Sequence, residues 1–322
     1  MKKILVTGAT GFVGKALTAQ LLYSEVEEVR AAVRVSDKAT YLESGCMSMP
    51  VGDIGPQTNW KSALLDVDAV IHLAARVHVM LDRESNPFSL YRRVNTEGTV
   101  NLARQAAEAG VRRFIYLSSI KVNGEQTRPG KPFTEWDMPA PLDFYAVSKY
   151  EAEEGLMELA KQTSMEIVII RPPLVYGPDV KGNFFTMMRW LQKGVPLPLG
   201  AIHNRRSLVA LDNLVDLIIT CLEQTVAANQ VFLAGDGEDL STTELMQRLG
   251  EALNRPARLV PVPPWLLTKA SIVFGKRAIA ERLCGSLQVD IAKAKSILGW
   301  SPPVSVDKAL KRTSIAYLSG LA

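Results

Sequence analysis

The sequence has few of the features that mark secreted, membrane-spanning or metal-binding proteins. Its 322 residues include only three cysteines, far apart and without a C-x-x-C spacing (Cys46, Cys221 and Cys284). We therefore expect free thiols, a reducing cytoplasmic compartment and no metal site. No run of about 18 apolar residues occurs, so no membrane insertion is expected. The first apolar run breaks at Thr7-Gly8, too early for the core of a secretory signal.

The chain has no large excess of charge of either sign. The net charge is +4, with 47% hydrophobic and 22% charged residues, which is ordinary for a globular protein that buries a core. A charge this small and dispersed suits an anionic small ligand and does not indicate a nucleic acid partner. The length fits one large domain or two smaller ones.

The first half of the chain alternates between short apolar runs and stretches with helical spacing. The runs are continuously apolar, which indicates strands buried on both faces of a parallel sheet covered by helices. Strands are predicted at residues 4–7, 29–33, 49–51, 69–74, 114–118 and 167–170, and helices at 15–24, 90–109 and 148–161. This pattern predicts an α/β doubly wound (Rossmann) fold.

After Arg171 the pattern changes, because prolines interrupt shorter elements. A strand is predicted at 230–234 and helices at 211–221 and 240–253, the last opened by a capping-box pattern at Ser241. The apolar segment 265–274 is too short to span a bilayer, and we interpret it as a buried or lid helix.

We expect two domains with the substrate in the cleft between them. The dinucleotide-binding domain is assigned to residues 1–171 plus about 205–235. A second, smaller α/β substrate domain is assigned to about 172–204 plus 236–322.

A glycine-rich run with the spacing G-x-x-G-x-x-G follows the first predicted strand and precedes a helix. Glycines there permit a tight turn and close approach of the backbone to a pyrophosphate, while the helix N-terminus offers free N–H groups. We expect cofactor contacts from Gly8, Thr10, Gly11, Phe12, Val13 and Gly14.

The end of the second predicted strand is where such folds choose between NAD and NADP. Arg34 stands there, with no acid before Asp37. An arginine accommodates a 2′-phosphate, so we lean slightly toward NADP; Arg34 stacking on adenine would suit either cofactor. Asp53 follows a weak strand and either caps a turn or binds the adenine amino group.

Tyr145 and Lys149 are four residues apart and share one face if a helix begins here. The ammonium and an oxidised nicotinamide ring would favour the phenolate and lower the pKa of Tyr145, so that it exchanges a proton near neutral pH. Ser118-Ser119 ends a strong strand at the carboxyl edge of the sheet, where ligands bind.

Together these motifs resemble the extended short-chain dehydrogenases/reductases, the group that includes UDP-glucose 4-epimerases and nucleotide-sugar dehydratases and reductases. The resemblance covers essentially the whole chain. Its further markers are His72-Leu-Ala-Ala75, Val94-Asn95, Arg171-Pro172, Val175-Tyr176-Gly177, Arg205 to Asp212 and Leu298-Gly-Trp300.

The resemblance implies roles for individual residues. Ser119 would hold the reacting oxygen, Tyr145 would be the acid/base, and Lys149 would bind the nicotinamide ribose and tune Tyr145. Further cofactor contacts are implied for Ile54, Leu73, Ala74, Ala75, Asn95, Tyr145, Lys149 and Pro172. Substrate contacts are implied for Arg76, Ser119, Lys121, Tyr145, Asn183, Arg205 and Arg282.

Arg205 matches the arginine that grips the nucleotide diphosphate; for Arg282 a solvated helix arginine is the competing interpretation. The chain departs from the family at Val122-Asn123-Gly124, where valine-tyrosine-glycine is usual. This departure could alter the pocket. The resemblance also implies a homodimer that pairs the helices at 90–109 and 148–161.

Our main functional hypothesis is NAD(P)H-dependent 4-keto reduction of a UDP-4-keto-6-deoxy-N-acetylhexosamine in surface polysaccharide (O-antigen) biosynthesis. The alternative is a UDP-glucose or UDP-N-acetylglucosamine 4-epimerase, which retains NAD and uses the same residues. A more remote alternative is a redox-sensing module that binds NAD(P) without catalysis.

Overall fold

The computed structural model of the chain describes residues 2–34, 42–77, 87–128, 130–273 and 277–320. Its centre is a seven-stranded sheet in the order β3-β2-β1-β4-β5-β6-β9, with every neighbouring pair parallel. The strands are β1 (Lys3–Thr7), β2 (Glu28–Val33), β3 (Met47–Pro50), β4 (Ala69–His72), β5 (Arg113–Leu117), β6 (Glu166–Arg171) and β9 (Gln230–Leu233). The predicted doubly wound α/β fold is confirmed.

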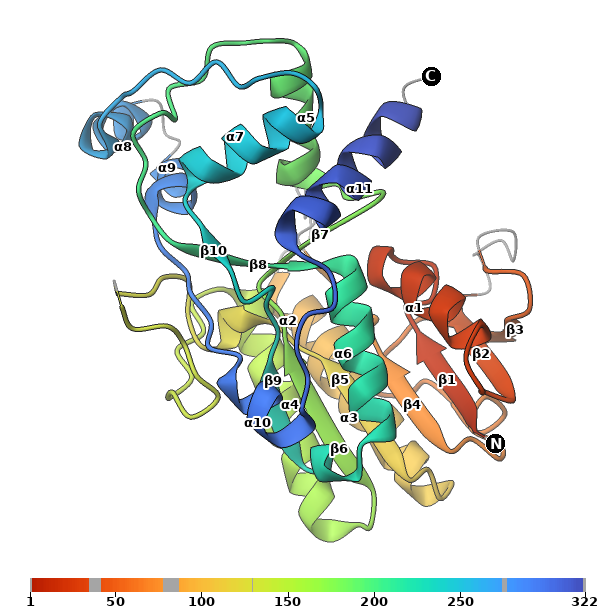
Figure 1. Cartoon of the computed structure of the whole chain (residues 1–322). Helices are drawn as coiled ribbons and strands as arrows, with labels where there is room; N and C mark the ends of the chain where they lie inside the picture. Colours follow the sequence, from red (N-terminus) through yellow and green to blue (C-terminus); the bar gives the residue numbers. More distant parts are fainter. Residues whose placement is uncertain (1, 35–41, 78–86, 129, 274–276, 321–322) are drawn as a thin grey trace.

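Helices cover both faces of this sheet (Figure 1). One face packs against α1 (Phe12–Leu22), α6 (Leu211–Glu223) and α10 (Ala292–Leu298). The other packs against α3 (Gly98–Glu108) and α4 (Phe144–Gln162). The predicted helix at 90–109 is interrupted: α2 (Pro87–Tyr91) runs into a π-helical turn at Arg92–Glu97 before α3 begins. Short 3₁₀ turns follow at Ile120–Val122 and Thr225–Ala227.

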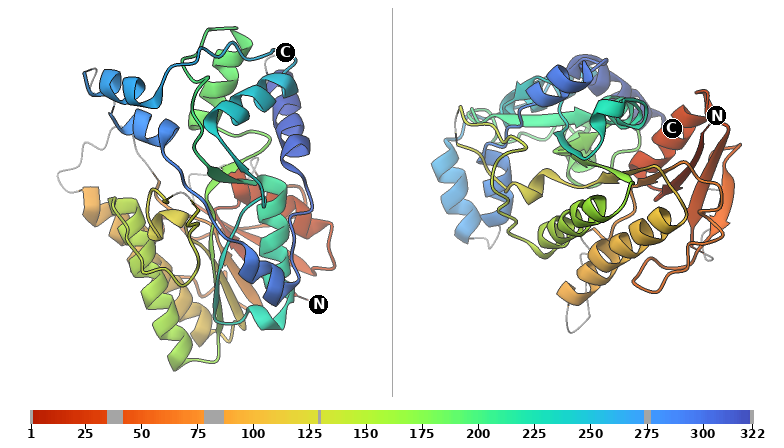
Figure 2. Two further views of the ribbon diagram at one scale, coloured as in Figure 1. Left: turned by 60° about the vertical axis from the view of Figure 1, so that its left-hand side comes forward. Right: turned by 90° about the horizontal axis from the view of Figure 1, so that it is seen from below.

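A second sheet of three short strands has the order β10-β8-β7, with β7 parallel and β10 antiparallel to β8. Its strands are β7 (Leu174–Tyr176), β8 (Arg206–Ala210) and β10 (Asp239–Leu240), and the helices around it are α5 (Gly182–Gln192), α7 (Thr242–Ala252), α8 (Pro264–Val273), α9 (Arg277–Cys284) and α11 (Val306–Ser319). Figure 2 shows this part of the chain at one end of the large sheet.

Two segments cross the domain boundaries that the sequence suggests. β8 belongs to the small sheet, although residues 205–235 were assigned to the dinucleotide-binding domain. Conversely, α10 and Trp300 pack into the apolar core of the large sheet, although they follow residue 236. The positions of β8 and α10 depend on strand pairing and on core contacts between distant segments. Local sequence patterns contain no information on such contacts.

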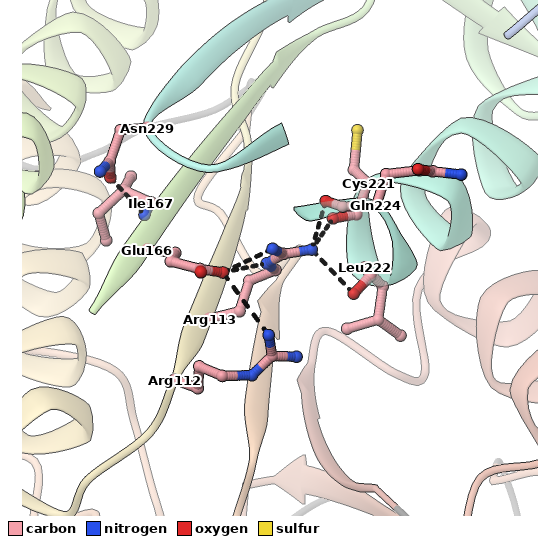
Figure 3. Close-up of polar contacts among 8 residues, drawn as sticks. All are labelled: Arg112, Arg113, Glu166, Ile167, Cys221, Leu222, Gln224 and Asn229. Atoms are coloured by element: carbon pink, nitrogen blue, oxygen red, sulfur yellow. Dashed lines mark hydrogen bonds and ion pairs between the residues drawn. The ribbon is translucent and has the colours of Figure 1, made fainter. Parts of the chain in front are cut away.

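A buried arginine ties the amino end of the inner strand β5 to the C-terminus of α6 (Figure 3). Arg113 on β5 is fully buried, and its Nη1 donates to the carbonyl oxygens of Cys221, Leu222 and Gln224 at 2.8–2.9 Å. Its Nη2 pairs with Glu166 on β6 at 2.5 Å. The carbonyls at a helix C-terminus lack intrahelical donors, so this guanidinium satisfies them and complements the helix dipole.

Helix α8 is exposed, so the buried alternative expected for this segment is wrong, while the lid alternative stays a prediction. Trp265, Leu266 and Ile272 are 60%, 45% and 54% exposed. No described helix is long and apolar enough to cross a membrane. Cys46, Cys221 and Cys284 are free thiols, as expected.

Candidate active site

The glycine-rich turn between β1 and α1 is built so tightly that side chains are excluded. Gly8 has φ +72°, and a Cβ there would lie 2.8 Å from the backbone nitrogen of Ala74. A Cβ on Gly14 would lie 2.0 Å from the carbonyl oxygen of Gly8. At Gly11, by contrast, the only atom a Cβ would approach is that same carbonyl oxygen, at 3.1 Å. The backbone of this turn is therefore not covered by side chains, and the space beside Gly11 is open.

The N-terminus of α1 faces this turn without a cap. Gly11 is the N-cap residue, no side chain caps the helix, and its first turn holds no acid. The first N–H groups of a helix have no intrahelical partner and carry a partial positive charge. This arrangement fits the pyrophosphate of a dinucleotide. The predicted contacts of Thr10, Phe12 and Val13 lie in the same turn and remain predictions.

A buried chain of hydrogen bonds positions the loop after β4. His72 Nδ1 lies 2.6 Å from Thr7 Oγ1, and its Nε2 lies 2.9 Å from Thr99 Oγ1. Thr7 Oγ1 also accepts a hydrogen bond from the backbone N–H of Ala74 at 3.2 Å. Burial lowers the pKa of His72 to about 3, so the ring is neutral. This network places Leu73, Ala74 and Ala75 beside the glycine turn.

Ser119 and Tyr145 meet where β5 and α4 converge. Asp143 caps α4 by accepting a hydrogen bond from the backbone N–H of Ala146 at 2.7 Å, so Tyr145 stands in the first turn. Burial, reinforced by the negative charge of Asp143, raises the pKa of Tyr145 to about 12. A hydrogen bond from Ser119 acts in the opposite direction. The serine and the phenol therefore lie within hydrogen-bonding reach of each other, and their catalytic roles remain predictions.

Lys149 lies one turn further along α4 and is fully buried. Its Nζ donates to the carbonyl oxygen of Leu117 at 2.6 Å and lies 4.0 Å from the ring centroid of Tyr116. Burial lowers the pKa of Lys149 to about 7, against the negative charge of Glu153, which raises it. The expectation that Lys149 lowers the pKa of Tyr145 concerns the site with the oxidised cofactor bound, and it stays a prediction.

A buried ion pair between Glu153 and Arg171 lies close to Lys149. Arg171 Nη2 lies 2.5 Å from Glu153 Oε2, and both side chains are almost completely buried. Arg171 Nη1 also donates to Asn123 Oδ1 at 2.9 Å, and Asn123 Nδ2 donates to the carbonyl oxygen of Thr134 at 2.8 Å. Asn123 is the residue that departs from the family pattern. Its side chain is buried and holds Arg171 and the loop at Thr134, so the departure supports the frame of the site.

Sequence reasoning missed Glu153 and Arg171 as parts of this frame. Glu153 follows Lys149 by four residues, a spacing that places both on one helix face, and this signal could have found it. Nothing local indicates that Arg171, at the end of β6, reaches Glu153.

Three other predicted residues are engaged in holding the site together. Asn95 is buried: its Oδ1 accepts from the backbone N–H of Arg76 at 2.7 Å, and its Nδ2 donates to Ser148 Oγ at 3.0 Å. Lys121 pairs with Asp143 and with Glu125. A cofactor contact by Asn95 and substrate contacts by Arg76 and Lys121 remain predictions, and the structure gives Asn95 and Lys121 a positioning role.

The remaining cofactor positions lie along the carboxyl ends of the strands. Arg34 follows β2 directly and is exposed, as is Asp53 after β3, while Pro172 after β6 is buried. Asp37 lies outside the described residues. The carbonyl oxygen of Pro172 accepts from the backbone N–H of Ile120 at 2.9 Å, which fixes the turn after Ser119. Ile54 is half-buried and packs against the core of α3 and α4.

Predicted diphosphate-binding residues gather at the small sheet. Arg205 precedes β8 and is exposed, and its backbone N–H donates to Ser286 Oγ at 3.0 Å. Arg206 Nη1 donates to the carbonyl oxygen of Arg282 at 2.8 Å. Burial and the neighbouring Arg282 lower the pKa of Arg206. The structure thus brings Arg282 close to Arg206, the residue that follows Arg205, whereas Asn183 lies exposed in the first turn of α5.

The glycine turn, the Ser119-Tyr145-Lys149 group and the strand order agree with one known family. The model of the NAD dependent epimerase/dehydratase family matches residues 4–235. The chain belongs to this family. Membership confirms the resemblance to the extended short-chain dehydrogenases/reductases, and it makes the chain an enzyme of an NAD-dependent family.

Members of the family with curated names cover almost all of the chain. This chain is 51% identical over 318 residues to a Vibrio cholerae protein named UDP-glucose 4-epimerase, and the match covers 98% of this chain and 96% of that protein. It is 27% identical to the N-acetyl-alpha-D-glucosaminyl-diphospho-ditrans,octacis-undecaprenol 4-epimerase of Escherichia coli O157:H7, covering 96% and 93%.

Among solved structures, UDP-glucose 4-epimerase from Thermotoga maritima, determined with UDP-glucose, superposes with a TM-score of 0.79. The match covers 99% of this chain and 100% of that one at 23% identity. At this identity the likeness establishes the fold.

Proposed function

We propose that this chain is a 4-epimerase of UDP-hexoses that retains NAD, the alternative in the sequence analysis. The observation that carries the proposal is the 51% identity, over 98% of the chain, to the Vibrio cholerae protein named UDP-glucose 4-epimerase. The main hypothesis of the sequence analysis, 4-keto reduction, has no comparable support. An intact Ser119-Tyr145-Lys149 group favours catalysis over a module that only senses the cofactor.

The chain's own residues would carry the proton of the C4 hydroxyl. Tyr145 would take that proton and return it, as a general base and then a general acid. The hydrogen bond from Ser119, which favours the phenolate, would also orient the reacting oxygen. NAD, when bound, supplies the hydride acceptor and donor for C4, and its positive ring opposes the burial that raises the pKa of Tyr145.

Arg205, Arg206 and Arg282 would hold the diphosphate of the substrate. Guanidinium groups remain charged and bind phosphate oxygens with two parallel hydrogen bonds. Arg206 Nη1 donates to the carbonyl oxygens of Arg282 and Gly285, and these hydrogen bonds fix its guanidinium group beside the small sheet. Asn183 would add a neutral donor from α5.

The choice of NAD over NADP follows from the proposed chemistry. An epimerase returns the hydride that it removes, so it needs no outside reductant. Arg34 is exposed at the end of β2, a position that suits stacking on adenine as well as a 2′-phosphate. The slight lean toward NADP therefore gives way to NAD in this proposal.

Proton NMR tests the proposal directly. The purified enzyme is incubated with UDP-glucose, and separately with UDP-N-acetylglucosamine, with a trace of NAD and no reductant. We expect the corresponding galacto-configured sugar to appear, and Tyr145→Phe to abolish it. No conversion of either sugar, together with oxidation of NADPH by a UDP-4-keto-6-deoxy-N-acetylhexosamine, would establish the reductase instead.

A further inference from the structure

Helix α8 turns its most apolar side chains to solvent. Trp265, Leu266 and Ile272 are 60%, 45% and 54% exposed, and they follow one another at helical spacing. Lys269 lies among them, with its Nζ 5.3 Å from the ring centroid of Trp265. Aromatic and aliphatic side chains with a lysine at their centre thus form one exposed stripe.

The side of α8 that faces the protein is the more polar one. Leu267, Thr268 and Ser271 are half-buried, and among the described side chains of α8 Leu267 alone contacts the apolar core of the small sheet. A surface helix of a globular protein normally has the reverse arrangement, with its apolar stripe on the core. Core packing therefore does not explain the exposed stripe.

Charge identifies the kind of contact. Residues 255–273, the connector and α8, contain three cations, Arg255, Arg258 and Lys269, and no acidic residue, so this segment carries +3 of the chain's net +4. The net charge, treated above as dispersed, is concentrated here, and the rest of the chain carries +1. Arg255, Arg258 and Lys269 are exposed. Figure 1 places the connector and α8 at the end of the molecule away from the large sheet.

We propose that α8 docks on the surface of an anionic phospholipid bilayer. Its apolar stripe would enter the headgroup region while Lys269 and the two arginines of the preceding connector bind acidic lipids, as the cations of interfacial helices do. A second copy of this chain is a poorer occupant, because two segments of like charge would repel each other. The helix has ten residues, too few to span, so the contact is peripheral. This inference does not depend on the proposed reaction.

Vesicle sedimentation tests the proposal. The whole enzyme is mixed with vesicles of phosphatidylcholine alone or with phosphatidylcholine and phosphatidylglycerol. We expect binding to the acidic vesicles only, weakened by salt. Replacing Lys269 by glutamine should lower the partition coefficient about fivefold. The double variant Trp265→Ser/Leu266→Ser should lower it by roughly tenfold or more.

Two further variants separate the contact from general effects. Leu65→Ser alters a leucine near α3 that is more exposed (65%) than Leu266, and it should leave binding unchanged. Trp265→Phe should still bind while losing a blue shift of tryptophan fluorescence on acidic vesicles. Equal binding to neutral vesicles, no binding at all, or full binding by the double variant would overturn the proposal. So would a dimer in solution that the double variant dissociates.

Discussion

The phenol of Tyr145 is surrounded by groups that keep it protonated in the protein by itself. Burial and Asp143 raise its pKa to about 12, and only the hydrogen bond from Ser119 lowers it. The phenol therefore keeps its proton at neutral pH, and a positive charge bound beside it would favour the phenolate. In the proposed reaction, the acid and base roles of Tyr145 would thus depend on the charge of the cofactor.

Replacing Tyr145 by phenylalanine removes the proton carrier and leaves the ring. We expect kcat to fall roughly a hundredfold or more, as for loss of a positioned general acid/base. NAD affinity, measured by fluorescence titration, should change little. An unchanged kcat would assign the proton to another group. Tyr150→Phe is the matched control, because Tyr150 lies in the same helix and is outside the proposed site.

His72 makes the stability depend on pH. Its pKa is lowered to about 3 in the folded protein and is about 6.5 in the unfolded chain. Between these values the unfolded chain binds the proton and the folded protein does not, so stability falls as the pH falls below 6.5. At pH 5 this amounts to about 2 kcal/mol.

His72→Asn should remove this dependence. Urea unfolding at pH 7 and pH 5 should show a loss on acidification that is about 2 kcal/mol smaller in the variant. His203→Asn, at an exposed histidine, should behave like the parent. If His72→Asn loses as much stability as the parent, other groups account for the acid sensitivity.

At the scale of elements, one buried ion pair joins α4 to β6. Glu153 comes from the helix that carries Tyr145 and Lys149, and Arg171 ends the strand beside β5, which leads to Ser119. The pair thus holds α4 against the sheet. Breaking a buried pair costs more than replacing both members, because one charge is left without a partner.

Arg171→Met should therefore destabilise the protein by about 3 kcal/mol or more. The double variant Glu153→Met/Arg171→Met should lose less than the single one, as measured by urea unfolding at pH 7. A cost for the double variant equal to the sum of the two singles would show that the pair is not coupled.

At the scale of the whole molecule, α3 and α4 present a common outer face. A hollow of about 520 Å³ lies between them, and its lining includes Arg92, Glu97, Arg104 and Glu151. Both helices pack their apolar side on the sheet, so the outer face is free for the homodimer that the sequence resemblance implies. We propose that the chain forms this homodimer through α3 and α4.

Light scattering after size exclusion tests it. We expect a mass of twice 35.3 kDa, and Glu97→Arg at the rim of the hollow should shift the protein toward the monomer. Glu223→Arg, at an exposed residue at the end of α6 on the other face of the sheet, should remain dimeric. A monomeric parent would exclude the dimer at the concentration used.

The sequence by itself determined the strands of the large sheet, the glycine turn, the Tyr145-Lys149 spacing and the family. Each of these depends on neighbours within a few residues, where backbone geometry and periodicity act directly. Tertiary structure decided that Asn123 supports Arg171, that Lys149 is fully buried, that β8 joins the small sheet and that α8 is exposed. These features depend on which distant segments meet, since burial and ion pairing arise only when the chain has packed.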